Sequence, residues 1–160
     1  MKTPVALVLL AGLLPGVSFA AQAAADTPVL GSWALDTSRM SMAPEARPKR
    51  VTIRFIDAGA GKWTTHVDIV GADGGESHSS STGMLDGSPT AVQGSPEADV
   101  AALKLPAPNV LVLVLSKGGV PGSTRIYSVA PDGQHLTETS AYFGEQGMPV
   151  LKTYYFSRVH

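Results

Sequence analysis

Turn-forming residue pairs recur along this chain and separate short runs that are rich in β-branched and aromatic residues. The clearest pairs are Asp73-Gly74, Asp86-Gly87, Gly118-Gly119 and Asp132-Gly133. Asp-Gly and Gly-Gly supply the positive φ angles that tight β-hairpins need, whereas no long window after the N-terminal apolar segment has a helical period. The sequence therefore predicts an all-β fold, a single antiparallel meander that closes into a barrel or stacks as a two-sheet sandwich.

Nine strands are predicted, and the segment 88–96 is expected to be a loop that holds at most one short strand, around Val92. A domain of this length with nine or ten short strands is typical of barrels and sandwiches. The predicted strands cover residues 31–36, 51–57, 63–71, 76–85, 100–105, 110–117, 123–130, 136–143 and 150–159.

The chain begins with the features of a secretory signal. Lys2 gives a positive start, residues 5–14 are apolar, and candidate cleavage sites lie in the small-residue stretch 20–25. We therefore expect a signal region, 1–25, and one β-barrel domain, 26–160, located in the periplasm or outside the cell. The apolar run is shorter than the roughly 20 residues that a bilayer crossing needs, so we expect no membrane-spanning segment.

Cysteine and charge exclude several classes of protein. The chain has no cysteine, so it has neither a disulfide framework nor a cysteine-linked lipid anchor. Taking Lys2 from the 12 Lys and Arg residues leaves 11 against 13 Asp and Glu, a formal charge of −2 for the mature chain. Nucleic-acid binders need concentrated basic side chains, and the single basic cluster, 47–50, lies in a proline-rich connector, so we expect no nucleic-acid partner.

The alternation of side chains along the strands predicts a register. A three-residue loop at 58–60 pairs Phe55 with Trp63 and brings the apolar faces of both strands to one core. A two-residue loop at Asp73-Gly74 then places Met84 opposite Trp63. The resulting inner face is apolar near Trp63 and mixed near the Asp73 turn, which favours a cavity with polar groups at one mouth over a solid core.

The same register puts His66 and Asp68 on the outer face, with Ser79 and Ser81 across from them. A Ser-His-Asp triad would need a strained serine turn, an oxyanion hole and a shielding pocket, and the sequence shows none of these. The register also sends His66 and His78 to opposite faces, and metal sites need three or four converging ligands. We therefore expect no catalytic residue, no metal and no cofactor.

Two motifs near the ends of the chain, and a series of short matches in the same order between them, carry a family resemblance. The segment 31–39 reads GSWALDTSR, and an aromatic-x-Arg motif stands at 156–158. With these motifs the chain resembles the small, exported, lipocalin-like β-barrel proteins of bacteria, whose roles are mostly unassigned and whose lead is G-T-W-x-L-N-x-A-K. The resemblance implies a lipocalin-like (calycin-type) barrel of eight to ten strands. The intervening matches lie at 86–87, 92–94, 96–99, 103–104, Asn109, 117–119, 124–125, 132–133, 136–137 and 147–150.

In lipocalins, the tryptophan of this lead closes one end of the barrel beneath an arginine from the last strand. The resemblance therefore implies that Trp33 and Arg158 form a barrel-closing structural pair. A cation–π contact of this kind is worth roughly 0.5–2 kcal/mol, depending on how far it is desolvated.

Two features depart from the family pattern. One strand is apolar on both faces, so that with its leucines inward, Val110, Val112 and Val114 form an exposed stripe, a candidate surface for a homodimer or an envelope protein. Burial of this stripe under a loop or a neighbouring strand is the alternative. The second feature is Glu138, which we expect to face outward; facing inward it would be a buried ligand anchor with a raised pKa.

The leading hypothesis is an exported, non-catalytic barrel that binds one small apolar or amphipathic ligand, since a barrel of eight to ten strands is wide enough for one. The alternative is a structural or protein-interaction module of the envelope with a side-chain-filled barrel. On face alternation alone, the residues expected to line a ligand are Phe55, Trp63, Val67, Met84, Leu111 and Leu113.

Overall fold

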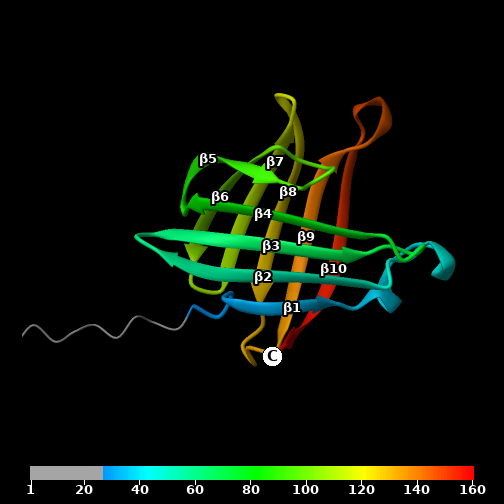
Figure 1. Ribbon diagram of the computed structural model, residues 1–160, viewed down its shortest axis with the longest axis horizontal. Coiled ribbons are helices and arrows are strands. Elements are labelled where there is room, and N and C mark those ends of the chain that lie inside the picture. The colour runs from blue at the N-terminus through cyan, green and yellow to red at the C-terminus, as the bar shows by residue number, and fades with distance from the viewer. Residues whose placement is uncertain (1–26) are drawn as a thin grey trace, which may run out of the picture.

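The computed structural model describes residues 27–160, so the predicted signal region and its cleavage site lie outside the described residues. Ten strands follow one another, each antiparallel to its neighbours, and the first strand also pairs with the last, which closes the sheet into a barrel (Figure 1). The predicted all-β meander is confirmed, and its form is the barrel rather than the sandwich.

No α-helix forms among residues 27–160, and none of the described residues belongs to a helix long and apolar enough to cross a membrane. Three single-turn 3₁₀ helices are η1 (Thr37–Arg39), η2 (Pro44–Ala46) and η3 (Glu145–Gly147). The strands are β1 (Gly31–Leu35), β2 (Arg50–Gly59), β3 (Lys62–Val70), β4 (Glu76–Met84), β5 (Asp86–Gln93), β6 (Val100–Ala107), β7 (Val110–Lys117), β8 (Val120–Val129), β9 (His135–Phe143) and β10 (Pro149–Val159).

The strand that the sequence analysis did not predict is β5, most of which lies in the segment expected to be a loop. It pairs with β4 only at Gln93 and Val92, and its pairing with β6 shifts register between Asp86 and Pro89. Proline has no N–H to give to a ladder and is depleted in strands, which is why the sequence signal for β5 was weak.

The β2–β3 hairpin differs from its predicted register by two residues. The loop is Ala60-Gly61, closed by the pair Gly59 and Lys62, and a bulge follows between Gly59 and Asp57. Phe55 consequently pairs with Thr65 instead of Trp63. Because the shift is even, the predicted faces are retained, and both aromatic side chains are buried in the core.

The β3–β4 hairpin differs from its predicted register by one residue. Gly71 donates its N–H to the Gly75 carbonyl (2.8 Å), so the loop has three residues, and the Asp73 carboxylate accepts the Gly75 N–H at 2.9 Å. A one-residue slip exchanges the two faces of a strand. Trp63 therefore pairs with Gly83, and the alternate serines Ser77, Ser79 and Ser81, rather than Met84, face inward.

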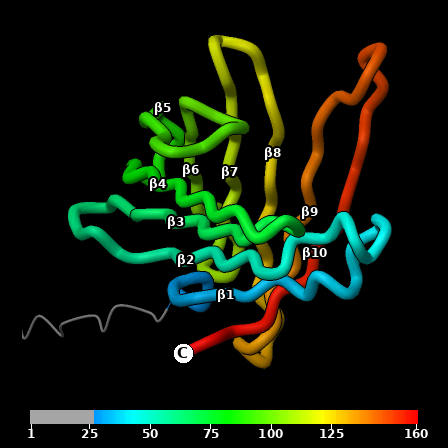
Figure 2. Tube along the Cα trace, turned by 45° about the vertical axis from the view of Figure 1, so that its right-hand side comes forward, coloured from blue at the N-terminus to red at the C-terminus, as the bar shows by residue number. Residues whose placement is uncertain are grey.

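The packed core fills one end of the barrel, and a cavity occupies the rest. On β3, Trp63 packs in the core, and the inward residues that come after it in the strand line the cavity. On β8, Val129 packs in the core, and the inward residues that come before it line the cavity. The β7–β8 and β9–β10 hairpins extend beyond the other strands and separate at their tips (Figure 2). Their inner sides, at Gly122 and Tyr142, belong to the cavity wall.

Candidate ligand-binding cavity

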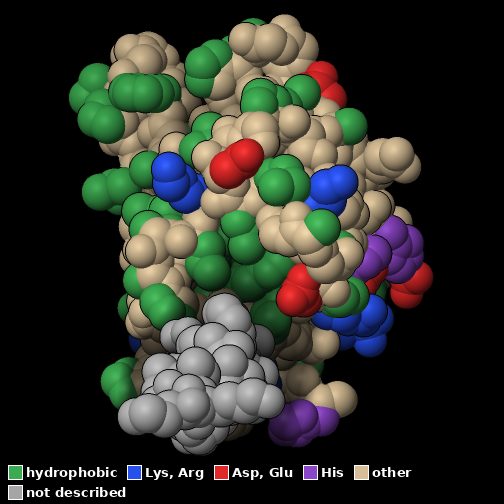
Figure 3. Space-filling model, turned by 90° about the vertical axis from the view of Figure 1, so that its left-hand side faces the viewer, with side chains coloured by type: hydrophobic (Ala, Val, Ile, Leu, Met, Phe, Trp, Pro, Cys, Tyr) green, Lys and Arg blue, Asp and Glu red, His purple; other side chains and the backbone are tan. Residues whose placement is uncertain are grey.

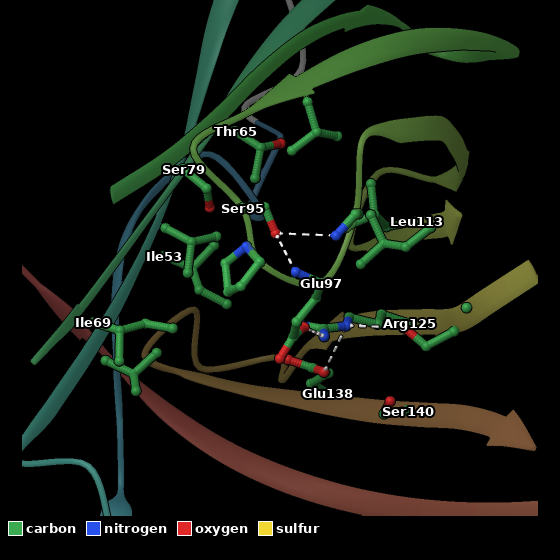
Figure 4. Close-up of a pocket in the computed structure, with 18 of the residues that line it drawn as sticks. Ile53, Thr65, Ile69, Ser79, Ser95, Glu97, Leu113, Arg125, Glu138 and Ser140 are labelled. Carbon is green, nitrogen blue, oxygen red and sulfur yellow. Dashed lines mark hydrogen bonds and ion pairs between the residues drawn. The ribbon is translucent and has the colours of Figure 1, made fainter. Parts of the chain in front are cut away.

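The cavity has a volume of about 610 Å³, which lies within the roughly 300–1,000 Å³ of small-molecule sites. The aliphatic and the polar side chains of its walls come mostly from different strands. Aliphatic side chains come from β2, β3 and β7, namely Val51, Ile53, Val67, Ile69, Leu113 and Leu115. Polar side chains come from β8 and β9 on one side, and from the serines of β4 on the other (Figure 4). A volume of this size is unlike the side-chain-filled barrel of the alternative hypothesis.

Three charged residues meet at the polar wall. Arg125 on β8 donates from Nη2 to Oε2 of Glu97 at 2.6 Å, and its Nε lies 3.7 Å from Oε1 of Glu138 on β9. The Glu138 side chain is 4% exposed and the Arg125 side chain 23% exposed. Figure 4 shows both carboxylates pointing toward the guanidinium from different elements. The cluster is thus an ion pair in the wall, with a second carboxylate added from a loop.

The expectation that Glu138 faces outward is wrong. Leu136, Glu138 and Ser140 alternate inward along β9 and are all buried. Burying a carboxylate costs its hydration, and here Arg125 and the neighbouring Tyr127 side chain offset that cost. Both partners lie on β8, so their proximity was not visible from the β9 sequence alone.

Burial raises the pKa of Glu138 above its ordinary value of 4.5, and the opposing effects of Arg125 and Tyr127 do not fully cancel that rise. Burial, followed by the nearby Glu138 charge, also raises the pKa of Tyr127. Tyr127 packs edge-on against Phe55, with ring centroids 5.2 Å apart, and so joins the charged cluster to the core.

The raised pKa of Glu138 predicts a pH-dependent stability. Between pH 4.5 and the higher folded-state pKa, the folded protein holds the proton that the unfolded chain has lost, so the free energy of unfolding falls as the pH rises and then levels off. Urea denaturation across this range should show that decline in the parent and a smaller one in Glu138→Gln. Equal declines in the two proteins would contradict the assignment.

The segment 94–99 carries Glu97 to the mouth of the cavity. Gly94 has a φ of +73°, and a Cβ there would collide with the His78 carbonyl, so this position requires glycine. The Ser95 hydroxyl accepts the N–H groups of Glu97 (3.1 Å) and Ala98 (3.2 Å), and Ala98 is buried. The segment is therefore an ordered turn at the cavity wall.

Strand β7 holds this turn in place. Lys117 donates to the Pro96 carbonyl, and the Gly118 N–H donates to the Asp99 carboxylate at 2.8 Å. The backbone of Asp99 also bonds to Ser116, with its N–H 3.0 Å from that carbonyl oxygen. These contacts fix the turn without using the Glu97 carboxylate.

The predicted lining residues fall into three groups. Val67 and Leu113 line the cavity. Phe55, Trp63 and Leu111 are buried in the packed core and do not line it. Met84 lies on the outer face, because the β3–β4 loop has one residue more than predicted. Sequence reasoning missed Arg125 and Glu97 altogether, although the alternation of Arg125 with the apolar Tyr127 and Val129 was a signal that this arginine points inward.

Trp33 and Arg158 are paired across β1 and β10 at the closed end of the barrel. The Arg158 Cζ lies 4.1 Å from the centroid of the fully buried Trp33 ring, whose Nε1 donates to the Val29 carbonyl at 2.9 Å. Gly31 has a φ of +120°, and a Cβ there would stand 2.5 Å from Arg158 Nη1, so the glycine makes room for the guanidinium.

All three side-chain hydrogen bonds of Arg158 go to backbone carbonyls. Its Nη1 donates to Leu30 (2.8 Å), Nη2 to Pro28 (2.6 Å) and Nε to Gly133 (2.7 Å). These bonds join the segment before β1 to the β8–β9 turn. The arrangement is thus a structural clasp in which each of the three guanidinium nitrogens donates one hydrogen bond.

The valine stripe lies on the outer face of β7, as alternation predicted. Val114 is 45% exposed, whereas Val110 and Val112 are half-buried. Val112 pairs with Ile126 on β8, and Ile126 is exposed, so the apolar surface continues onto the next strand. A homodimer or envelope partner at this stripe stays a prediction.

His66 and His78, on the outer face of the β3–β4 hairpin, do not form a candidate site. His78 Nδ1 lies 2.6 Å from the Asp68 carboxylate, its cross-strand partner, and His66 shares this outer face, so the expected placement of the two histidines on opposite faces is wrong. Among the described residues, no group of three or more His, Cys, Asp or Glu is placed to hold a metal ion.

On the face shown in Figure 3, basic and acidic side chains are interspersed and form no broad basic patch.

Comparison of the chain with family models, curated proteins and solved structures finds no match.

Proposed function

We propose that this protein is a non-catalytic, lipocalin-like barrel that holds one small amphipathic ligand. The observation that carries the proposal is the cavity of about 610 Å³, which has aliphatic walls on β2, β3 and β7 and a partly buried ion pair, Arg125 with Glu138, on β8 and β9. Ligand sites combine mostly apolar walls with a few well-placed polar groups that fix orientation. An apolar chain with one polar end matches this division.

An unpaired buried hydroxyl supports a partly polar ligand. Thr65 is 5% exposed and lines the cavity, and its Oγ1 has no hydrogen-bond partner among the described residues (Figure 4). Buried polar atoms are normally paired, because an unpaired one carries the cost of its lost hydration. A polar atom of a ligand beside Thr65 would supply the missing partner.

The side-chain arrangement supports binding without chemistry. Ser77, Ser79 and Ser81 point into the cavity, while His66 and His78 lie on the outer face of the same hairpin, so none of these serines has a histidine base beside it. We also propose that the protein acts in the periplasm or outside the cell, on the signal-like composition of residues 1–25.

Titration with an uncharged fluorescent probe, N-phenylnaphthylamine, tests the proposal. The mature protein is expected to give a saturable increase in fluorescence with one probe per chain. Ser79→Phe, which projects a ring into the cavity, should weaken probe binding about tenfold or more, equivalent to at least about 1.4 kcal/mol. Thr82→Phe is the matched control, because Thr82 is exposed on the outer face of the same strand. Absence of saturable binding, or equal loss in the two variants, would reject the proposal.

A further inference from the structure

The polar wall contains one permanently charged cation. Arg125 is the only Lys or Arg among the described residues that line the cavity. A guanidinium is planar, stays ionised and offers paired donors that match a carboxylate. Its Nη2 is occupied by Glu97 at 2.6 Å, whereas Glu138 is 3.7 Å from Nε, beyond a normal hydrogen bond. The short contact on Arg125 is therefore the one that Glu97 makes.

Glu97 differs from Glu138 in how it is held. Its side chain is 64% exposed, and its carboxylate has one hydrogen-bond partner among the described residues, Arg125. The turn that carries it is fixed through Ser95, Pro96 and Asp99. The Glu97 side chain can therefore rotate away without rearranging the turn, and an ion pair with an exposed partner adds little stability.

Rotation of Glu97 would leave Arg125 facing the cavity with its outermost donors free. The remaining carboxyl, Glu138, is a poor competitor for them because it lies beside Nε rather than the outermost nitrogens, at 3.7 Å, and because its side chain is held in the wall at 4% exposure. The aliphatic walls of β2 and β7 then adjoin a guanidinium that accepts one carboxylate.

We infer that Glu97 stands in for the headgroup of the ligand: the ligand is a carboxylate-ended amphiphile whose carboxylate displaces Glu97 from Arg125 while its apolar chain lies along β2, β3 and β7. This inference rests on the proposed ligand-binding function and specifies the ligand class. It also makes Glu97 an internal competitor, which occupies the cation while the cavity is empty and gives it up when an acid enters.

Three ligands with one tail and different headgroups separate this inference from the proposed function. Dodecanoic acid, dodecanol and dodecylamine are each used, below their aggregation concentrations, to displace N-phenylnaphthylamine from the mature protein at neutral pH. The acid is expected to displace the probe at about one tenth of the alcohol concentration or less, as a charge-assisted pair predicts. Equal potency of acid and alcohol, or stronger binding of the amine, overturns the inference and leaves the proposed function standing. A probe that does not bind overturns both.

Variants test the exchange itself. Glu97→Gln removes the competitor and should tighten binding of the acid several-fold, with the alcohol changed by less than about twofold. Glu145→Gln is the control for net charge, because Glu145 is an exposed acid in η3 and does not line the cavity. Weaker acid binding in Glu97→Gln, or the same change for acid and alcohol, would overturn the inference.

The paired variant Arg125→Gln/Glu138→Gln removes the cation together with its buried partner, so that no unpaired buried charge threatens folding. It should bring the acid down to the affinity of the alcohol. An acid that keeps its advantage in this variant would show that Arg125 is not the anchor.

Discussion

Trp33→Ala is expected to lower the free energy of unfolding by about 3–5 kcal/mol, the usual cost of truncating a large buried aromatic side chain. The ring is fully buried beneath the Arg158 guanidinium, and its Nε1 donates to the Val29 carbonyl. Truncation opens a void in the core, removes the ring from the cation and leaves the carbonyl unpaired. Urea denaturation followed by circular dichroism measures the change.

Two comparisons sharpen this result. Trp33→Phe keeps a ring under Arg158 but loses the N–H donor, so its loss of stability should be smaller than that of the alanine variant. Because Trp33 does not line the cavity, the folded fraction of Trp33→Ala should still bind the neutral probe with nearly the parent affinity. An unchanged free energy of unfolding would show that the clasp at the closed end does not stabilise the barrel.

Arg125→Met should also destabilise the barrel by about 3–5 kcal/mol, because it leaves the Glu138 carboxylate buried without its cation. The double variant Arg125→Met/Glu138→Gln should recover most of this loss, since a neutral amide needs no counter-charge. A double-mutant cycle in urea at neutral pH measures the coupling.

The same cycle has an internal check. Loss of stability in Arg125→Met should shrink as the pH falls, because the raised pKa of Glu138 lets the buried carboxyl take up a proton. Glu97→Gln is the matched control, and it should cost less than about 1 kcal/mol because Glu97 is mostly exposed. A double variant whose loss is the sum of the two single losses would contradict a direct Arg125–Glu138 interaction.

The sequence was sufficient to predict the architecture because hairpins are specified locally. The turns at Gly118-Gly119 and Asp132-Gly133 are encoded by residues that lie next to each other, and the end of β8 before the second turn alternates between exposed and buried residues. Register was less secure. The Asp73 turn has three residues, with the Asp73 carboxylate accepting the Gly75 N–H, and this one residue more than predicted exchanges the two faces of β4.

The site was harder to predict because its parts come from distant segments. Glu97 reaches Arg125 over 28 residues, and Glu138 comes from the next strand. Glu97 taken alone has an ordinary explanation as a solvated surface charge, and the alternation of Arg125 with Tyr127 and Val129 indicates its direction but not its partners. Only their convergence inside a closed sheet shows that the charges offset one another, and no local pattern reports that convergence.

The closure of the barrel has a consequence for how the chain can fold. Every strand pairing joins sequence neighbours except β1–β10, which joins residues 32–35 to 156–159. Until the final strand is available, the growing meander has two unpaired edges, and each can add a strand from another molecule. Loss of β10 would therefore turn the closed barrel into an open sheet with two unpaired edge strands, β1 and β9. Pairing of β1 with β10 is therefore the contact that removes both exposed edges.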